Sequence, residues 1–450
     1  MTHKVLIANR GEIALRIQRA CRSLNLPFVQ ACSEADLPAR YVQMADEHIC
    51  IGPARAAQSY LDRAALIAAA HATGATMVHP GYGFLSEQAQ FAQDVAEEGL
   101  IFVGPPADAI RRMGDKISAR QCMIASDVPC IPGSEGALPD DPDALRAIAA
   151  RIGYPVIVKA SAGGGGRGMR VVETESALTE AVALTREEAR NAFGNSELYL
   201  ERYLITPRHV ELQVLCDGHG TCIHLGDRDC SLQRRHQKVI EEAPAPGVDR
   251  DLIDRVAARC LQACRDMSYR GAGTFEFLYE DGALYFIEMN TRLQVEHPVT
   301  EAITGVDIVA AQLRIAMGEP LGLTQEDITF SGHAIECRIN AEDPKTLTPS
   351  PGTISHWSAP EIDGLRLETH VYAGYTVPPQ YDSLIGKAIT HGADRSDAIT
   401  RMALALDGIK VAGIATNIAL HQRLLRDPVI ARGGMGISYL GTLLAEETAP

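Results

Sequence analysis

Polar side chains that could bind a metal ion or an anion recur at every second position between residues 288 and 296. Apolar residues and one threonine fill the positions between them. Because side chains alternate between the two faces of a strand, this spacing predicts one polar face if the chain stays extended. Such a face is commonly only solvated, but this one lacks lysine and serine and holds carboxylates, amides and a guanidinium. The residues are Glu288, Asn290, Arg292, Gln294 and Glu296.

A further acid, Glu276, precedes this segment across Asp281-Gly282, a typical hairpin turn. A two-residue turn would leave Glu276 and Glu288 on opposite faces, whereas a three-residue loop with a left-handed bulge at Gly282 would set them directly opposite each other. Two carboxylates about 5 Å apart repel by roughly 3 kcal/mol at an effective dielectric constant near 20. A divalent cation would remove this repulsion. We therefore predict the bulged register and a magnesium or manganese site, since these ions prefer oxygen ligands.

The remainder of this face is suited to an anion beside the metal ion. Arg292 can hold a planar oxyanion with its forked guanidinium. Gln294 can orient that anion, and Glu296 can accept a proton from it. Glu296 could instead form an ion pair with Arg292 or Arg338. Its position beyond the metal-binding acids favours a catalytic role.

Four consecutive glycines, Gly163 to Gly166, lie between two short apolar runs in "VKASAGGGGRGMRVV". With Gly168 they match the dinucleotide pattern G-x-G-x-x-G, but the β-branched residues that follow do not indicate the required helix. A Walker loop is excluded, because no Gly-Lys-Ser or Gly-Lys-Thr follows. The remaining interpretation is a mobile hairpin tip with Lys159 on the incoming strand. It could fold over phosphates, or it could be a flexible surface loop.

Two other groups are ambiguous on their own. Gln233, His236 and Lys238 in "RDCSLQRRHQK" fit a solvated edge strand as well as a binding site. His209 in "TPRHVELQV" is more typical of a structural histidine than of a ligand. The 11 cysteines include no C-x-x-C pair, which favours free thiols in a reducing compartment over a zinc site.

The elements that must position these residues change along the chain. In residues 1–114 apolar runs alternate with helical spacing, which predicts a parallel sheet with helical crossovers. Residues 115–330 are expected to form a second domain, with a lid subdomain at about 131–203 around the glycines. Residues 331–450 are expected to form a third, α+β domain. The predicted fold class is therefore α/β and α+β in three parts.

Composition excludes some classes of function. The formal net charge of −15 over 450 residues argues against nucleic-acid binding, which requires a broad excess of cations. The N-terminus becomes charged too early for a secretory signal, and no apolar run is long enough to cross a bilayer. We therefore expect a cytoplasmic protein that binds neither nucleic acid nor membrane.

The glycine loop with Lys159, "RDCSLQRRHQKVIEEAPAP" and "FIEMNTRLQVEHPVTE" together resemble the ATP-grasp enzymes. More narrowly they resemble the biotin carboxylase family, the ATP-using component of acetyl-CoA carboxylase. The resemblance covers nearly the whole chain, including "KVLIANRGEIALRI", "HPGYGFLSE", "GHAIECRINAEDP" and "YAGYTVPPQYDSLIGK". It implies a three-part ATP-grasp architecture and the ATP-driven carboxylation of biotin by bicarbonate through carboxyphosphate.

The resemblance also implies a role for each candidate residue. The residues that would contact ATP are Lys116, Lys159, Gly163, Gly164, Gly165, Gly166, Glu201, Leu204, His209, Gln233 and His236, together with Glu276 and Glu288. The ligands of Mg²⁺ or Mn²⁺ would be Glu276, Glu288 and Asn290. Bicarbonate would be held by Arg292, Gln294 and the Val295 backbone and deprotonated by Glu296. Lys238 would lie near the transferred phosphate, Arg338 would stabilise the biotin enolate, and Tyr82 would lie near biotin.

Partners follow from the same resemblance. The chain contains no Met-Lys-Met biotin acceptor, so biotin is expected on a separate biotin carboxyl carrier protein that also serves carboxyltransferase subunits. A homodimer is implied, as is the first half-reaction of acetyl-CoA carboxylase in fatty acid synthesis. One alternative is the same half-reaction in a propionyl-CoA, methylcrotonyl-CoA or pyruvate carboxylase. The others are an ATP-grasp ligase that forms another acyl phosphate and a catalytically silent nucleotide-binding partner.

Overall fold

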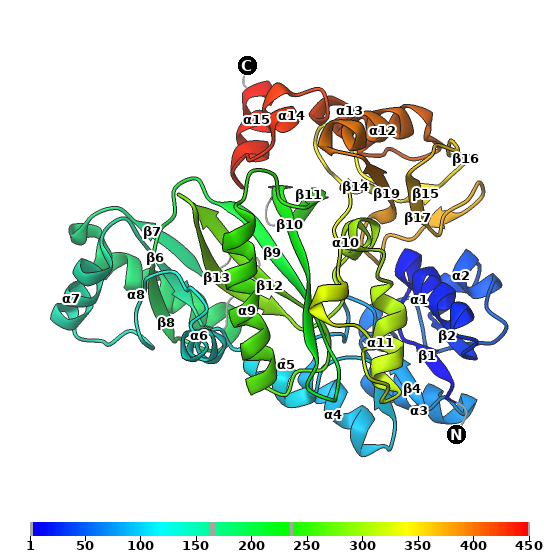
Figure 1. The fold of residues 1–450 in the computed structure, drawn as a ribbon, viewed down its shortest axis with the longest axis horizontal. Helices are drawn as coiled ribbons and strands as arrows, with labels where there is room; N and C mark the ends of the chain where they lie inside the picture. The colour runs from blue at the N-terminus through cyan, green and yellow to red at the C-terminus, as the bar shows by residue number, and fades with distance from the viewer. Residues whose placement is uncertain (1–2, 162–167, 235–236, 449–450) are drawn as a thin grey trace.

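The computed structural model describes residues 3–161, 168–234 and 237–448. Within these ranges the chain is organised around an antiparallel sheet of eight strands, in the order β13-β12-β9-β10-β11-β14-β19-β17. A small subdomain lies to one side of this sheet, on the left in Figure 1. The N-terminal domain, in blue, and the C-terminal helices, in orange and red, lie toward the other side and the top.

The N-terminal domain is a parallel sheet with the strand order β3-β2-β1-β4-β5, as predicted. Its three inner strands β2, β1 and β4 are buried at every position, which is typical of parallel sheets covered by helices, whereas the edge strand β3 is largely exposed. Side-chain and glycine caps define some helix ends: Asp62 accepts from Ala65 N–H at the start of α3, and Gly74 adopts the left-handed conformation at its end. The elements are β1 Val5–Ile7, α1 Gly11–Ser23, β2 Phe28–Cys32, η1 Glu34–Asp36, α2 Arg40–Gln43, β3 His48–Cys50, η2 Ala56–Gln58, α3 Arg63–Thr73, β4 Met77–His79, α4 Ala89–Glu97, β5 Ile101–Phe102 and α5 Ala107–Gly114.

The subdomain around the glycine run is a three-stranded antiparallel sheet, β7-β6-β8, covered by two helices. The four glycines Gly163 to Gly166 lie outside the described residues, but the flanking strands β6 and β7 do pair as a hairpin. The elements are α7 Pro142–Ile152, β6 Val156–Ala160, β7 Met169–Val172, α8 Glu175–Phe193 and β8 Leu198–Arg202. Helix α6 Lys116–Ala125 precedes the subdomain and packs against β13 of the central sheet.

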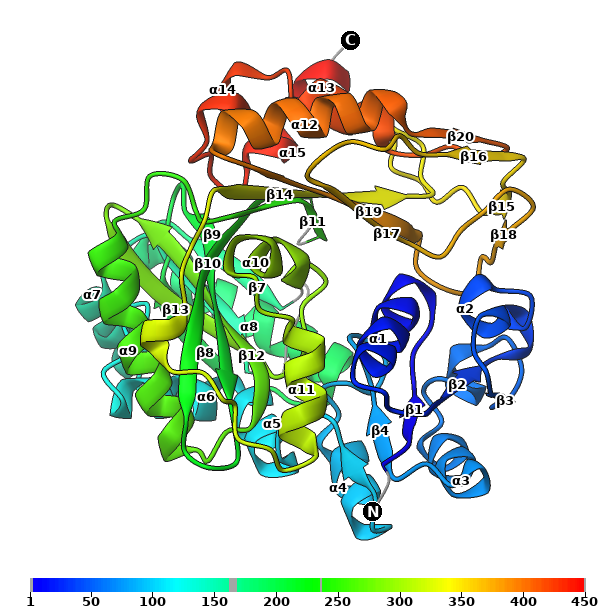
Figure 2. The ribbon, with the colours of Figure 1, turned by 45° about the vertical axis from the view of Figure 1, so that its right-hand side comes forward.

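The central sheet continues across residue 330 without interruption. Strand β14 pairs with β11 on one side and with β19 on the other, so the strands after residue 330 extend the sheet that carries the candidate site (Figure 2). The central elements are β9 Arg208–Cys216, β10 Cys222–Arg234, β11 Gln237–Ala243, α9 Arg250–Asp266, β12 Gly271–Glu280, β13 Ala283–Asn290, α10 His297–Thr304, α11 Ile308–Ala316 and η3 Gln325–Asp327.

The C-terminal part covers this extension of the sheet with helices, of which α12 packs on β19. Two small two-stranded sheets, β15-β18 and β16-β20, complete it. Its elements are β14 His333–Asn340, β15 Gly352–Thr353, β16 His356–Ser358, β17 Leu365–Thr369, β18 Thr376–Val377, β19 Leu384–Gly392, α12 Arg395–Gly408, β20 Lys410–Ala412, α13 Ile418–Leu424, α14 Pro428–Arg432 and α15 Tyr439–Thr448.

The β12–β13 hairpin has the predicted register but not the predicted turn. Glu276 lies directly opposite Glu288, so the expected facing of the two acids is confirmed. However, Glu280 pairs with Ala283, so the loop has only two residues, both with positive φ. The predicted three-residue loop is therefore wrong. The extra residue lies within β13, where the register shifts between the pairs Glu276–Glu288 and Phe277–Phe286. This β-bulge restores the alignment of the acids.

Apolar side chains form separate cores in the described part of the chain. The largest core joins the N-terminal and C-terminal parts, since it includes Ile13 and Ile17 of α1 together with Ile335 and Met402. The subdomain around the glycine run has a core of its own. Displacement of that subdomain as a unit would therefore leave the largest core intact. Among the helices in the described ranges, none combines the length and apolar character needed to span a bilayer.

A buried histidine of the N-terminal domain predicts a pH dependence of stability. His79 is fully buried, and its Nδ1 accepts a hydrogen bond from Gly81 N–H at 3.0 Å, which requires the neutral ring. Burial lowers the pKa of His79 from 6.5 to about 3. Between these values the unfolded chain binds more protons than the native chain, so the free energy of unfolding falls as pH decreases. The expected slope is about 1.4 kcal/mol per pH unit for this group.

His79→Asn tests this expectation, because the asparagine Oδ1 can still accept the Gly81 N–H. We expect the free energy of unfolding of this variant, measured with denaturant between pH 6.5 and 4, to depend less strongly on pH than that of the wild type. The difference should correspond to the uptake of about one proton fewer on unfolding. His356→Asn, at an exposed histidine, is the control and should leave the slope unchanged. Equal slopes in the wild type and His79→Asn would contradict the prediction.

Candidate active site

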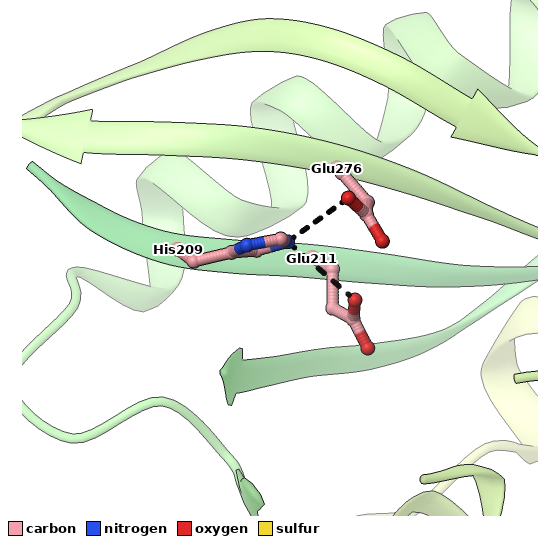
Figure 3. Close-up of side chains that lie close together, drawn as sticks. All are labelled: His209, Glu211 and Glu276. Carbon is pink, nitrogen blue, oxygen red and sulfur yellow. Dashed lines mark ion pairs between the residues drawn. The ribbon is translucent and has the colours of Figure 1, made fainter. Parts of the chain in front are cut away.

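A row of three carboxylates crosses the central sheet. Glu288 on β13 faces Glu276 on β12, and Glu276 in turn faces Glu211 on β9. Figure 3 shows Glu211 and Glu276 on the same side of their strands as His209. His209 Nε2 lies 3.2 Å from Glu276 Oε2 and 3.8 Å from Glu211 Oε2. One ligand atom from each of these three residues lies within 4.8 Å of the others.

The two predicted metal-binding acids have opposite pKa shifts. Burial raises the pKa of Glu288, and the charge of Glu276 raises it further. Burial would also raise the pKa of Glu276, but Lys238 and His209 outweigh it and lower that pKa. Two facing acids that repel each other when both are ionised form a suitable site for a dication, because its charge would favour the ionised form of both carboxyl groups. Oxygen atoms of Glu276 and Glu288 are also the donor type that magnesium and manganese prefer.

Lys238 joins the carboxylate row to Glu296. Its Nζ donates to Glu211 Oε2 at 2.7 Å, to Glu276 Oε1 at 3.0 Å and to Glu296 Oε1 at 2.5 Å. These three carboxylates raise the pKa of Lys238 well above its usual range, although burial opposes the shift. A permanent cation therefore lies between the candidate metal site and Glu296.

Glu296 is fully buried between two cations. Its second oxygen accepts from Arg338 at 3.0 Å, and Arg338 also donates to Glu241 at 2.5 Å. Burial would raise the pKa of Glu296, but Lys238 and Arg338 outweigh it and hold that pKa well below its usual range. Glu296 is therefore ionised at neutral pH, as a proton acceptor must be. Of the two ion pairs considered from the sequence, the one with Arg338 is present.

The predicted anion-binding residues gather in a different conformation from the one expected. Strand β13 ends at Asn290, so the expectation of an extended face as far as Glu296 is wrong. Arg292 instead folds back, donating to Asn290 Oδ1 and to Gln294 Oε1, each at 2.9 Å. Gln294 Nε2 donates to Glu276 Oε1 at 3.2 Å. Hydrogen bonds rather than strand alternation therefore hold these side chains beside the carboxylate row.

Two residues distant in the sequence hold the segment 291–295, which follows β13, in this folded-back conformation. Glu87 of the N-terminal domain accepts from the Thr291 N–H at 3.1 Å and from Arg292 Nε at 2.8 Å. Lys387 on β19 is fully buried, and its Nζ donates to the Val295 carbonyl oxygen at 2.7 Å. The Val295 peptide, which was assigned to the bicarbonate site, is thereby held in one orientation.

Tyr82 is connected to the same region through Glu12. Its hydroxyl donates to Glu12 Oε1, and the same oxygen lies 3.1 Å from Lys387 Nζ. Burial and the Glu12 charge raise the pKa of Tyr82 well above its usual range, so the hydroxyl stays protonated. The predicted neighbour of biotin therefore lies on the side of the site formed by the N-terminal domain.

The remaining nucleotide-binding candidates lie toward the lid subdomain. Lys159 Nζ donates to Glu201 Oε2 at 2.5 Å, across the β6–β8 pair. Burial lowers the pKa of Lys116, and the charge of Glu288 opposes this shift, so Lys116 lies within electrostatic range of the carboxylate row. Further candidates are Leu204, which is buried, and Gln233, whose Nε2 lies 3.3 Å from His209 Nδ1. His236 lies outside the described residues, as do Gly163 to Gly166.

Sequence reasoning missed Glu211, Glu87 and Lys387. Glu211 was detectable, because His209, Glu211 and Gln213 alternate with apolar residues as the candidates after Glu276 do. All nine positions of β9 are buried, so polar side chains at every second position there indicate a site rather than a solvated face. Neither Glu87 nor Lys387 belongs to a local pattern of this kind.

The fold and this site together define an ATP-grasp enzyme. Residues 1–110 match the family described as "Biotin carboxylase, N-terminal domain", residues 115–324 "Carbamoyl-phosphate synthase L chain, ATP binding domain", and residues 336–442 "Biotin carboxylase C-terminal domain". The chain is 61% identical over 440 residues to "Biotin carboxylase" of Pseudomonas aeruginosa, covering 98% of each chain. It therefore belongs to the biotin carboxylase family, and the predicted family and three-part fold are confirmed.

Two solved structures have the same fold over nearly the whole length. A biotin carboxylase from Campylobacter jejuni in a β,γ-ATP complex has a TM-score of 0.93 and 46% identity, with 98% of each chain covered. The biotin carboxylase domain dimer of Hydrogenobacter thermophilus 2-oxoglutarate carboxylase, in complex with MgADP, ADP and bicarbonate, has a TM-score of 0.92 and 45% identity, with the same coverage.

Proposed function

We propose that this protein catalyses the ATP- and magnesium-dependent carboxylation of biotin by bicarbonate. The observation that carries the proposal is the position of Glu296, an ionised carboxylate held by Lys238 and Arg338 beside the row of acids. A proton acceptor, a cation for developing phosphate charge and a pair of metal-binding acids are thus adjacent. The relatives crystallised with a β,γ-ATP ligand and with MgADP and bicarbonate support the choice of substrates.

In the proposed site, Glu276 and Glu288, with Asn290, bind the magnesium or manganese ion, which neutralises triphosphate charge when bound. Glu211 is added to this group because it faces Glu276. Lys116 and Lys159 contact phosphate oxygens, with Gly163 to Gly166 closing over them. Adenine is assigned to the segment Glu201 to Leu204, and His209, Gln233 and His236 line the nucleotide pocket. Phosphoryl transfer depends on such positioning and charge neutralisation.

Bicarbonate is assigned to Arg292, Gln294 and the Val295 backbone. Glu296 accepts its proton as the bicarbonate oxygen attacks the γ-phosphorus, giving carboxyphosphate and ADP. Lys238 stabilises charge on the transferred phosphoryl group. Removal of the proton during attack helps because bicarbonate is a weak nucleophile. Exclusion of water by a closed lid protects carboxyphosphate from hydrolysis.

The test is transfer of labelled bicarbonate to free biotin, with ATP and magnesium each omitted in turn. We expect acid-labile label on biotin only in the complete mixture. Bicarbonate-dependent ADP release that biotin does not stimulate would instead favour another acyl phosphate as the product. No nucleotide hydrolysis under any condition would favour a catalytically silent binding protein.

Arg338 should separate the two stages of the reaction. Its guanidinium is assigned to the biotin enolate, whose charge develops only after carboxyphosphate has formed. We expect Arg338→Gln to reduce biotin carboxylation by about 10- to 100-fold, as for a lost hydrogen bond to a charged group. Bicarbonate-dependent ATP cleavage without biotin should fall much less. Equal loss in both assays would contradict a role specific to biotin.

We further propose that biotin arrives on a biotin carboxyl carrier protein, that carboxyltransferase subunits complete the assembly, and that the chain works as a cytoplasmic homodimer. The dimeric domain of the 2-oxoglutarate carboxylase supports the dimer. The assembly we favour is acetyl-CoA carboxylase, in fatty acid synthesis. The Hydrogenobacter thermophilus domain is 45% identical to this chain and belongs to a 2-oxoglutarate carboxylase. The same half-reaction could therefore also supply a carboxylase with another acceptor. Pull-down of a biotinylated carrier from the native organism, with transferase subunits identified by mass, distinguishes these assemblies.

The proposed functional units are residues 1–114, residues 115–330 with a lid at 131–203, and residues 331–450. The separate core of the lid supports its treatment as a unit. Limited proteolysis with and without ATP tests the lid, since nucleotide should protect its boundaries from cleavage.

A further inference from the structure

Two cysteines face each other at the end of the β9–β10 hairpin. Cys216 on β9 is paired directly with Cys222 on β10. The next pair toward the loop is closed by a hydrogen bond of 2.9 Å from Asp217 N–H to the Thr221 carbonyl oxygen. Hydrogen-bonded and non-hydrogen-bonded pairs alternate along an antiparallel ladder, so Cys216 and Cys222 form a non-hydrogen-bonded pair.

This type of pair has the spacing that a disulfide needs. The Cα atoms of non-hydrogen-bonded pairs lie about 4.5 Å apart, which falls within the range of about 4.4–6.8 Å found across disulfide bonds. On its other side Cys216 is paired with Gly271, which has no side chain. Of the two residues paired with Cys216 on the neighbouring strands, only Cys222 therefore has a side chain beside the Cys216 sulfur.

The two thiols differ in access and in acidity. Cys216 is buried, whereas Cys222 is partly exposed. A hydrogen bond from Cys216 lowers the pKa of Cys222, and the nearby Arg265 charge lowers it further. Burial and contacts with Cys222 and Cys264 raise the pKa of Cys216. The accessible thiol is therefore also the one that more readily becomes a thiolate, which is the nucleophilic form.

The pair lies outside the proposed catalytic site. Glu211 and Cys216 are on the same strand, separated by five residues, or roughly 17 Å at 3.3–3.4 Å per residue. Neither cysteine has a role in the proposed carboxylation. An accessible thiol beside a buried partner instead matches the arrangement of redox-sensitive cysteines.

We propose that Cys216 and Cys222 form a reversible oxidative modification site for hydroperoxides. The Cys222 thiolate attacks the peroxide oxygen, giving a sulfenic acid and releasing hydroxide, or alkoxide from an organic peroxide. The Cys216 sulfur then displaces the sulfenic hydroxyl, forming the S–S bond and releasing water after proton transfer. The peroxide is reduced by two electrons and the two thiols are oxidised. An external dithiol reverses the change by thiol–disulfide exchange.

The test is brief treatment of the full chain with hydrogen peroxide, followed by thiol titration after denaturation and by peptide mapping. We expect the wild type to lose two of its 11 titratable thiols and to yield a single new disulfide-linked peptide pair joining Cys216 and Cys222. Dithiothreitol should restore both thiols. Pairing of other cysteines, or irreversible oxidation without a cross-link, would overturn the assignment.

Single variants establish the order of the two steps. Cys222→Ser should react with peroxide at least about tenfold more slowly, since the thiolate is lost. Cys216→Ser should still react but should accumulate a sulfenic acid at residue 222 that dimedone traps. Cys50→Ser is the matched control, because Cys50 is more exposed and faces Cys32, whose pKa burial raises to about 12. That variant should retain the wild-type cross-link. Loss of the cross-link in Cys50→Ser, or its persistence in Cys222→Ser, would contradict the proposal.

Discussion

Glu296→Gln is expected to reduce biotin-dependent ADP release by about 10²- to 10⁴-fold, the range that removal of a general base produces. The amide keeps the shape of the carboxylate, and its one oxygen can accept from either Lys238 or Arg338, which bond different oxygens of Glu296, but it cannot accept a proton. Lys238 retains Glu211 and Glu276 as partners, and Arg338 retains Glu241. The fold should therefore survive, and the loss should fall on turnover rather than on nucleotide affinity.

The measurement is kcat with saturating ATP, bicarbonate and biotin, together with the affinity for ATP. Glu242→Gln is the matched control, because Glu242 is buried, is ion-paired with Arg395 and hydrogen-bonded to His333, and directly follows Glu241 on β11. Adjacent strand positions face opposite sides of a sheet, so Glu242 points away from the side that carries Glu241. This control should change stability without a comparable loss of kcat. Unchanged turnover in Glu296→Gln would show that another group takes the bicarbonate proton.

The sequence predicted those parts of the site that depend on short-range alternation. Glu276 and Glu288 were expected opposite each other, and they are. The predicted position of the bulge that aligns them was wrong, because the local residues are as compatible with a bulge inside β13 as with one at the turn. Where a bulge forms depends on how the neighbouring strand and core pack. Single-sequence periodicity contains no information on that choice.

Residues beyond Asn290 show where local reasoning fails. Arg292, Gln294 and Glu296 do gather near the acids, but they do so in a hydrogen-bonded turn rather than on a strand. The turn is fixed by Glu87 and Lys387, about 200 residues before it and 90 residues after it in the chain. Such contacts arise from tertiary packing, which overrides local pattern.

Glu288→Gln is expected to change activity and stability in opposite directions. Because Glu288 is assigned to the metal ion, its removal should lower kcat/KM for MgATP by about 10²- to 10³-fold, as for loss of one preorganised charge. The same change removes the repulsion between two facing acids. Without metal or nucleotide the variant should therefore be more stable than the wild type, by at most about 3 kcal/mol. A carboxylate with a purely structural role would not combine these effects.

The pH dependence of unfolding gives an independent check on the same residue. The raised pKa of Glu288 means that the native chain binds more protons than the unfolded chain above the ordinary value of 4.5. This group therefore makes the wild type lose stability as pH rises through its native pKa, and Glu288→Gln should lack that loss. Glu280→Gln on β12 is the control, since the amide can still accept the Thr206 N–H at the far end of the hairpin.

Magnesium and nucleotide should then reverse the order of stability. A ligand that binds only the native state stabilises it by about 2.7 kcal/mol at 100 times its Kd, so the wild type should gain strongly from saturating MgADP. Glu288→Gln should gain much less at the same concentrations, and its thermal midpoint should fall below that of the wild type. If both proteins gained equally, Glu288 would not bind the metal ion, and the facing acids would need another explanation.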